Sequence, residues 1–246
     1  MEFSVEEQNM YRLHKQIWDS VLSARKSVPL IDTYIDTVIF DVGANRGQSL
    51  REYSALFPNS EIHAFEPNSD LNSYISREML KFPHNRFHLL NIGLGSTEEE
   101  REFNIYADDG VSSFLRAETF LPTLNANSWS LQSNDPLLLK TLDIYTSKSN
   151  SVPDILKIDT QGFDLEVLKG AQELLKSGEI SIIGIEVLFT KNYEKQGYFW
   201  DIASFLFNHG YQLYDFTRLV HTTRGNLYFG DATFLSVKAW QSIGLV

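Results

Sequence analysis

The sequence contains no cysteine among its 246 residues, which excludes disulfide bonds, zinc sites built from thiolates and a cysteine nucleophile. Basic residues are scarce as well, because 21 lysines and arginines stand against 32 aspartates and glutamates, a formal net charge of -11. No run rich in lysine or arginine occurs. Since nucleic acids and anionic membranes attract basic surfaces, we expect neither as a partner.

Long apolar segments are also missing. The longest, ISIIGIEVLF at 180–189, is far shorter than the roughly 20 residues that span a bilayer. The N-terminal stretch MEFSVEEQNM lacks a basic segment followed by an apolar one, so it does not resemble a signal peptide. We therefore expect a cytoplasmic protein. Hydrophobic residues make up 43% and charged residues 22% of the chain, which is typical of a globular domain.

Strand and helix patterns alternate from residue 37 onward, which predicts an α/β fold with a parallel sheet. The strand patterns are TVIFDV, EIHAFEP, RFHLLNIGL, DILKID, EISIIGIEV, YQLYDF and DATFLSV. The helical patterns span 47–56, 69–81, 164–176 and 198–209. The connection before the last strand is too short for a crossover helix, so we expect that strand to pair antiparallel with its predecessor.

The N-terminal segment has its own pattern. Apolar residues recur at helical spacing over 5–27, with charged residues between them. We therefore expect a helical extension at 1–30, with the main domain at 31–246. This helix either packs on the edge of the domain or acts as a lid over a ligand site.

An inserted region interrupts the alternation at about 100–145. Two further strand patterns, REFNIYA and LLLKTLDIY, surround an irregular loop at 107–136. Long loops inside compact domains are usually functional or disordered. This loop is interpreted as a partly ordered cover over a ligand site, with a mobile linker as the alternative.

The stretch FDVGANRGQSL contains a glycine turn between the first strand and the first helix. Asp41, Gly43 and Gly47 form the pattern D-x-G-x-x-x-G. A dinucleotide-binding loop requires G-x-G-x-x-G, but here Asn45 and Gln48 stand where the second and third glycines should be. A pyrophosphate would therefore lack its close backbone approach. The alternative is a tight turn that binds no ligand.

Polar residues follow the second and third strands. Glu66 ends the second strand, where a carboxylate can accept hydrogen bonds from both hydroxyls of a ribose. Asn91 and Ile92 follow the third strand, where an amide and an apolar side chain could flank an adenine. The alternatives are a solvated acid at a strand end and a simple turn. In a doubly wound sheet, ligands bind at these carboxyl ends.

Together these residues resemble the FkbM family of S-adenosylmethionine-dependent methyltransferases. The matching segments are FDVGANRGQSL, HAFEPN, NIGLGS, GVSSF, LKTLDIY and ILKIDTQGFDLEVLKGA, within about 37–237. The resemblance implies a Rossmann-like class I methyltransferase fold, with a mostly parallel seven-stranded sheet, an antiparallel last strand and helices on both faces. It implies S-adenosyl-L-methionine as cofactor and S-adenosyl-L-homocysteine as product. The residues expected to bind the cofactor are Asp41, Gly43, Asn45, Gly47, Glu66, Asn91, Ile92 and Asp159.

The resemblance also implies an activity. Members of the family are thought mostly to methylate hydroxyl oxygens, often on sugars or secondary metabolites, so we expect an O-methyltransferase with a small-molecule or carbohydrate acceptor. This sequence has Thr160-Gln161 where many members have Val-Glu, which weakens inference about the substrate. Transfer to nitrogen or carbon stays open, as does the oligomeric state.

Two acidic residues are candidates for catalysis. Asp159, at the end of the fourth strand, is the first candidate to orient or deprotonate a hydroxyl, or to hold the amino group of the cofactor. Glu186, at the end of the fifth strand, is the second, and its alternative is a structural acid in an ion pair. Asp164 could join both in binding magnesium. We do not expect this metal site, because the same chemistry can run without metal.

The six histidines carry a weaker signal, because none forms a metal-binding pair at helical spacing. His63 and His88 lie in expected strands and are interpreted as packing residues. His221, before the last strand, is the one most able to face a substrate. Two other functions stay open: a non-catalytic protein that uses the cavity for binding, and a nicotinamide-dependent oxidoreductase. The missing second glycine and the antiparallel last strand argue against the oxidoreductase.

Overall fold

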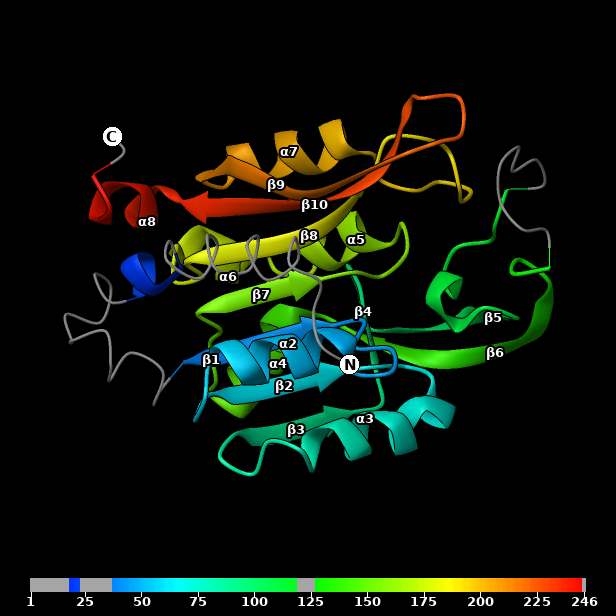
Figure 1. The fold of residues 1–246 in the computed structure, drawn as a ribbon, viewed down its shortest axis with the longest axis horizontal. Coiled ribbons are helices and arrows are strands. Elements are labelled where there is room, and N and C mark those ends of the chain that lie inside the picture. The colour runs from blue at the N-terminus through cyan, green and yellow to red at the C-terminus, as the bar shows by residue number, and fades with distance from the viewer. Residues whose placement is uncertain (1–17, 23–36, 119–126, 245–246) are drawn as a thin grey trace.

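A seven-stranded sheet forms the centre of the computed structural model, which describes residues 18–22, 37–118 and 127–244 (Figure 1). The strands, in spatial order, are β3 (Arg86–Leu90), β2 (Glu61–Phe65), β1 (Val38–Val42), β7 (Ile155–Ile158), β8 (Ile182–Leu188), β10 (Leu227–Ser236) and β9 (Tyr211–His221). The strands from β3 to β8 are parallel, whereas β10 runs antiparallel to both of its neighbours. The expected fold class and the antiparallel last strand are confirmed.

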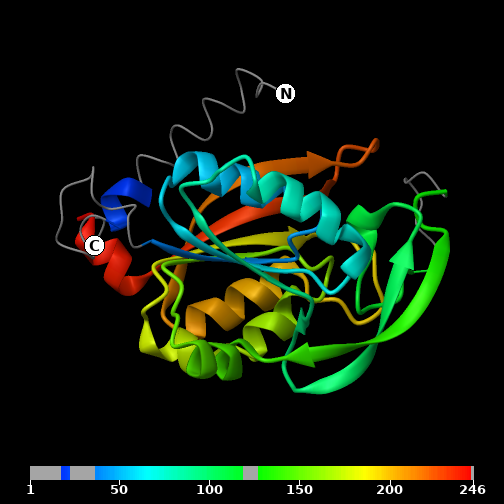
Figure 2. The ribbon, with the colours of Figure 1, turned by 90° about the horizontal axis from the view of Figure 1, so that it is seen from below.

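Helices cover both faces of this sheet (Figure 2). On one face lie α2 (Gln48–Leu56) and α3 (Asn72–Met79), which follows the short 3-10 helix η2 (Ser69–Leu71). On the other face lie α4 (Leu142–Ser149), α5 (Asp164–Lys169), α6 (Gln172–Ser177) and α7 (Phe199–Asn208). The central strands are buried on both sides for this reason, and four of five residues in β1 and in β2 are buried. No helix in the described part of the chain combines the length and apolarity needed to cross a membrane.

The chain leaves the centre of the sheet in two directions. From β1 it moves outward to β2 and β3, and from β7 it moves the other way to β8. The neighbours β1 and β7 therefore flank the point where strand order reverses. Ligands in open α/β sheets bind in the crevice at this point, outside the carboxyl ends of the strands.

The last strand of the sheet does not end the chain. After β10 a short helix, α8 (Val237–Ser242), begins at the cap residue Ser236, whose Oγ accepts a hydrogen bond from the backbone N–H of Ala239 at 3.2 Å. A serine in this position satisfies one of the free N–H groups at a helix start. The sequence reading of DATFLSV as the closing element was therefore incomplete.

The inserted region forms a second sheet of three strands, in the order β4 (Gly93–Leu94), β6 (Leu131–Lys140) and β5 (Glu99–Tyr106). The reading of LLLKTLDIY as one strand is wrong beyond Lys140, because α4 begins at Leu142. Thr141 caps this helix by accepting the N–H of Ile144 at 3.2 Å. The expected irregular loop at 107–136 is wrong from Leu131 onward, because β6 begins there. Residues 119–126 of this loop lie outside the described residues, so the choice between cover and linker stays a prediction.

The expected helix at 164–176 is two helices, α5 and α6, with Gly170 at the end of the first. A Cβ atom on Gly170 would lie 2.0 Å from the carbonyl oxygen of Gly95. Only glycine allows two backbones to approach this closely. Gly170 is therefore the residue that lets α5 pass against the loop after β4, and it does not lie in the middle of a helix.

Of the N-terminal helix expected at 5–27, only residues 18–22 lie among the described residues, and these are helical. Trp18 stacks on Tyr53 and Phe57, with ring centroids 5.9 and 5.8 Å apart. Val21 and Leu22 are fully buried in the same hydrophobic cluster. This piece of chain therefore packs on the face of the sheet that α2 covers. Whether the rest acts as a lid lies outside the described residues.

Candidate active site

A cavity of about 420 Å³ opens at the carboxyl ends of β1, β2, β7 and β8. Its wall also includes Asp231 of β10 and Phe103 of the inserted sheet. The volume lies in the range of small-molecule sites. Of the residues expected to form the site, six line the cavity: Gly43, Asn45, Glu66, Ile92, Asp159 and Glu186. The other three, Asp41, Gly47 and Asn91, lie behind or beside its wall.

The loop between β1 and α2 passes between two strands with little room. Gly43 has a φ of +77°, and a Cβ there would lie 1.9 Å from the carbonyl oxygen of Asp159. The N–H groups of Gly43 and Ala44 both donate to the carbonyl of Phe65, at 3.0 and 3.1 Å. The glycine is therefore required by the close approach of β7 as well as by its backbone conformation. This result explains the first glycine of the sequence motif.

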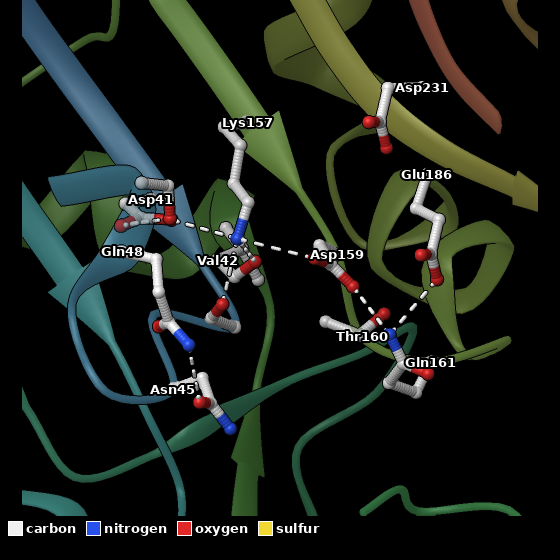
Figure 3. Close-up of polar contacts among 12 residues, drawn as sticks. Asp41, Val42, Asn45, Gln48, Lys157, Asp159, Thr160, Gln161, Glu186 and Asp231 are labelled. Atoms are coloured by element: carbon white, nitrogen blue, oxygen red, sulfur yellow. Dashed lines mark hydrogen bonds and ion pairs between the residues drawn. The ribbon is translucent and has the colours of Figure 1, made fainter. Parts of the chain in front are cut away.

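Asp41 lies beneath this loop and forms an ion pair with Lys157 (Figure 3). The distance from Lys157 Nζ to Asp41 Oδ1 is 3.0 Å, and the Asp41 side chain is fully buried. Ser49 Oγ donates to the same carboxylate at 3.0 Å, and Lys157 Nζ donates to the carbonyl of Gly43 at 2.7 Å. Burial alone would lower the pKa of Lys157, but the charges of Asp41 and Asp159 raise it above its ordinary value. Lys157 is thus a permanent cation that ties β1, β7 and the loop together.

Glu66 lies at the end of β2 and forms part of the cavity wall. It is 5% exposed, and its Oε2 accepts the N–H of Asn45 at 2.8 Å while Oε1 accepts the N–H of Asn68 at 2.9 Å. Burial raises its pKa to about 7, although both N–H donors act in the opposite direction. Each carboxylate oxygen can accept more than one hydrogen bond, so capacity for a ligand remains on both.

Asn91 and Gly47 support the wall from outside. The side-chain amides of Asn91 and Asn72 exchange two hydrogen bonds, at 2.7 and 2.8 Å, and Asn91 Nδ2 donates to the carbonyl of Glu66 at 3.2 Å. Gly47 is the cap residue of α2 and has a φ of +85°. Both residues shape neighbouring backbone, whereas the adjacent Ile92 reaches the cavity. His221 ends β9, is exposed and lies away from the cavity wall.

Gln161 joins the two candidate catalytic acids at the other end of the cavity (Figure 3). Its Nε2 donates to Asp159 Oδ1 at 2.8 Å and to Glu186 Oε2 at 3.0 Å. Its Oε1 accepts the hydroxyl of Tyr193 at 3.1 Å. Gln161 has a φ of +56°, an uncommon conformation for this residue type. The sequence showed this glutamine only as a departure from the family pattern.

Two carboxyl groups in this part of the cavity, Glu186 and Asp231, hold protons more tightly than usual. Burial, followed by the negative charge of Asp159, raises the pKa of Glu186 well above its ordinary value. Burial likewise raises the pKa of Asp231 to about 6. Asp231 is the direct partner of Glu186 in the antiparallel pairing of β10 with β8. The raised pKa favours the protonated form of Glu186, and a protonated carboxyl group can donate a hydrogen bond.

The magnesium set considered from sequence does not converge. Asp164 Oδ1 accepts the N–H of Thr160 at 2.9 Å, and its Oδ2 accepts the N–H of Gly162 at 3.0 Å. The carboxylate therefore closes the turn between β7 and α5 instead of facing the cavity. Within the described ranges, Asp159, Asp164 and Glu186 do not bring their ligand atoms within 4.8 Å of one another.

Comparison with solved structures identifies several methyltransferases of low similarity. Precorrin-6y C5,15-methyltransferase from Geobacter metallireducens GS-15 has 16% identity and a TM-score of 0.45, over 90% of this chain and 88% of that one. Magnesium protoporphyrin IX methyltransferase (ChlM) from Synechocystis PCC 6803, with bound SAM, has 11% identity and a TM-score of 0.45, over 96% and 86%. An rRNA methylase from Streptococcus thermophilus has 8% identity and a TM-score of 0.45, over 92% and 95%. These similarities are too low to support a conclusion about substrate.

Sequence comparison gives the firmer result. No curated protein matches the chain. The model of the methyltransferase FkbM domain, however, matches residues 41–213, from the aspartate of β1 to the start of β9. This span includes the β1–α2 loop, Glu66 and the cluster of carboxyl groups around Gln161. The chain therefore belongs to the FkbM methyltransferase domain family, and it is an S-adenosylmethionine-dependent methyltransferase.

Proposed function

We propose that this protein transfers the methyl group of S-adenosylmethionine to a hydroxyl oxygen of a small molecule or a carbohydrate. The observation that carries the proposal is one cavity with two chemically different ends. One end has the buried carboxylate of Glu66, and the other has Asp159 and Glu186 held together by Gln161. The first suits a ribose, and the second suits a hydroxyl that must lose a proton.

The fit of the cofactor rests on Glu66. A buried carboxylate is costly unless hydrogen-bond donors satisfy it, and the raised pKa of Glu66, about 7, reflects that cost. Two ribose hydroxyls would supply the missing donors to its two oxygens. Ile92 offers an apolar surface to the adenine, and the backbone at Gly43 and Asn45 borders the same space. The residues present therefore fit S-adenosylmethionine.

Three residues expected to bind the cofactor are assigned an indirect role. Asp41 pairs with Lys157, Gly47 begins α2, and Asn91 bonds to Asn72 and to the backbone of Glu66. We propose that they hold the loop and the wall in shape. The binding contacts then come from Gly43, Asn45, Glu66, Ile92 and Asp159.

Asp159 and Glu186 have different roles in this proposal. S-adenosylmethionine, when bound, supplies a methyl group already activated by its sulfonium. Asp159 is 37% exposed on its side chain and accepts the proton of the acceptor hydroxyl. Glu186, whose raised pKa favours its protonated form, donates a hydrogen bond that orients the acceptor. Gln161 fixes the geometry of both groups, which matters because methyl transfer depends on alignment.

The charge of the site narrows the class of acceptor. Asp159, Glu186 and Asp231 all border the acceptor end, together with the cation Arg218. Carboxyl groups repel phosphate but bind hydroxyl groups well, and the whole chain carries a formal charge of -11. We therefore propose a polyhydroxylated acceptor, and we do not expect a nucleic acid.

A methyl-transfer assay tests this proposal. Purified protein is incubated with methyl-labelled S-adenosylmethionine and a panel of sugars, glycosides and hydroxylated small molecules, with an amine panel and an RNA in parallel. We expect S-adenosylhomocysteine to form with one hydroxylated class and NMR to show an O-methyl product. An N-methyl or C-methyl product would refute transfer to oxygen. Binding of S-adenosylhomocysteine with no transfer to any member would favour a protein that uses the cavity only for binding.

A further inference from the structure

Three side chains of the types that bind zinc meet at the edge of the main sheet, away from the cavity. Glu61 and His63 lie two residues apart on β2, so they point to the same face. His88 lies on the edge strand β3, directly opposite His63 in the strand pairing. The backbone of two paired strands therefore fixes the positions of all three.

The ligand atoms of this cluster lie close to one another. Glu61 Oε1 lies 2.8 Å from His63 Nε2 and 3.4 Å from His88 Nε2. All three atoms lie within 4.8 Å of one another, and no other such group occurs in the ranges that the structure describes. Atoms that bind one tetrahedral zinc ion at about 2.05 Å are separated by about 3.3 Å. The distance between Glu61 and His88 is close to this value, whereas the shorter distance between Glu61 and His63 is that of a hydrogen bond.

The second polar atoms of Glu61 and His63, which are not part of the proposed site, also have hydrogen-bond partners. Arg86 Nε and Nη2 both donate to Glu61 Oε2 at 3.2 Å, which leaves Oε1 directed at the two imidazoles. The hydroxyl of Tyr145 lies 2.6 Å from His63 Nδ1. Zinc-binding histidines and carboxylates commonly have their second polar atom held in this way, because the outer contact orients the ligand.

The three side chains differ in their exposure to solvent, so an ion could reach the cluster from one side. The side chain of His63 is 3% exposed, that of Glu61 is 23% exposed and that of His88 is 51% exposed. Solvent reaches the cluster at Glu61 and His88, and the hydroxyl of Ser151 lies 3.3 Å from His63 Nε2.

The cluster is separate from the cavity. Glu61 begins β2, whereas Glu66 follows its end, a separation of about 17 Å at 3.3–3.4 Å per strand residue. None of the three residues lines the cavity. Any ion here therefore acts on the sheet edge and takes no part in methyl transfer.

We propose that Glu61, His63 and His88 bind one Zn²⁺ ion and that this ion fastens the edge strand β3 to β2. Two imidazole nitrogens and one carboxylate oxygen are a ligand set that zinc accepts. The two imidazole rings stack, with centroids 4.3 Å apart and planes 28° from parallel, which agrees with the sequence reading of both as packing residues. For both Nε2 atoms to bind one ion, one ring must turn.

The alternative is a network of hydrogen bonds alone, in which Glu61 Oε1 accepts a hydrogen bond from one or both histidines. Both arrangements use the same contacts, but only the zinc site saturates with metal. The variants His88→Ala and Glu61→Gln test the difference, because both side chains are partly exposed and their loss leaves the buried His63 in place. The control is His84→Ala, which removes an exposed histidine from the connection before β3.

The experiment is a titration of tag-free, chelator-treated protein with Zn²⁺ against a chromophoric competitor, followed by thermal unfolding with and without the metal. We expect one ion per chain with a Kd in the roughly micromolar range or tighter, and a rise in Tm. His88→Ala and Glu61→Gln should weaken binding by at least about tenfold, whereas His84→Ala should not change it. Absence of saturable binding, or equal affinity in His88→Ala and His84→Ala, would overturn the proposal.

Discussion

Lys157 and Asp41 form a buried ion pair beneath the β1–α2 loop, with 3.0 Å between Nζ and Oδ1. The lysine also donates to the carbonyl of Gly43, so one cation holds the end of β1 and the loop that follows it. Sequence reasoning assigned Asp41 to the cofactor because of its place in the motif. In the structure the carboxylate of Asp41 pairs with Lys157. The consequences of this ion pair can be measured.

Lys157→Met should therefore destabilise the protein strongly. The change leaves the buried carboxylate of Asp41 without its cation, which typically costs about 3–5 kcal/mol. Urea unfolding of the variant measures the loss. Lys169→Met is the control, because Lys169 pairs with Glu166 at the surface and should contribute less than about 1 kcal/mol. Equal losses of unfolding free energy in the two variants would contradict the role assigned to Lys157.

Gly43→Ala should distort the loop between β1 and α2. A Cβ there would meet the carbonyl oxygen of Asp159 at 1.9 Å, so the loop or β7 must move. Gly225→Ala provides the matched control, because Gly225 has a similar φ of +86° but nothing within 4 Å of the added atom. We expect Gly225→Ala to cost about 1–2 kcal/mol from backbone conformation alone. Gly43→Ala should cost more and should weaken S-adenosylhomocysteine binding by at least about tenfold; normal binding would refute the close-packing argument.

Binding of S-adenosylhomocysteine should depend on pH through Glu66. The free protein holds a proton on Glu66 up to a pKa of about 7, whereas ribose hydroxyls donate to the ionised form. Affinity should therefore rise about fivefold between pH 6 and pH 7 and level off above pH 8, with release of a proton. Calorimetry in two buffers of different ionisation enthalpy measures this release. Glu66→Gln should bind more weakly and lose this part of the pH dependence.

The same pKa affects the stability of the free protein. Glu66 has a folded pKa of about 7 against an ordinary 4.5, so its contribution is fully present below pH 4.5 and is lost as the pH rises through 7. A shift of this size corresponds to about 3 kcal/mol. Thermal unfolding should show Glu66→Gln gaining stability relative to the wild type at pH 8, but much less at pH 5. If the stability difference between Glu66→Gln and the wild type were the same at pH 8 and at pH 5, this result would contradict the raised pKa of Glu66.

Glu186→Gln should reduce turnover far less than Asp159→Asn does. Burial raises the pKa of Glu186 and so favours its protonated form, which glutamine matches in shape and as a hydrogen-bond donor. Asparagine at position 159 removes the base, and turnover should fall by about 10²–10⁴ with a smaller change in acceptor KM. Steady-state kinetics of both variants separates the two roles. Near-normal turnover in Asp159→Asn would end its assignment as base.

Residues that follow a strand directly could be placed from the sequence. Gly43, Glu66 and Asp159 were expected at the carboxyl ends of three strands, and they line one cavity because parallel strands end at one edge. The parallel direction of the central strands followed from the same alternation, whereas their spatial order did not. Which of these residues contact the cofactor is a question for binding experiments.

Features that depend on contacts between distant segments could not be read from the sequence. Lys157 and Gln161 are joined to Asp41 and Glu186 only by folding, and no local pattern marks either pairing. The segment LLLKTLDIY was interpreted as one strand, although Thr141 caps a helix within it. The reason is that its apolar residues suit both a strand and a buried helix.

Titration with S-adenosylhomocysteine, with NADH as a parallel ligand, tests the central claim most directly when wild-type protein and Glu66→Ala are compared. We expect the wild type to bind S-adenosylhomocysteine with a roughly micromolar Kd and to ignore NADH. Glu66→Ala should weaken that binding by about 2–4 kcal/mol, or about 30-fold or more. Unchanged affinity in Glu66→Ala would remove Glu66 from the site, and binding of NADH alone would contradict the assignment of the cavity.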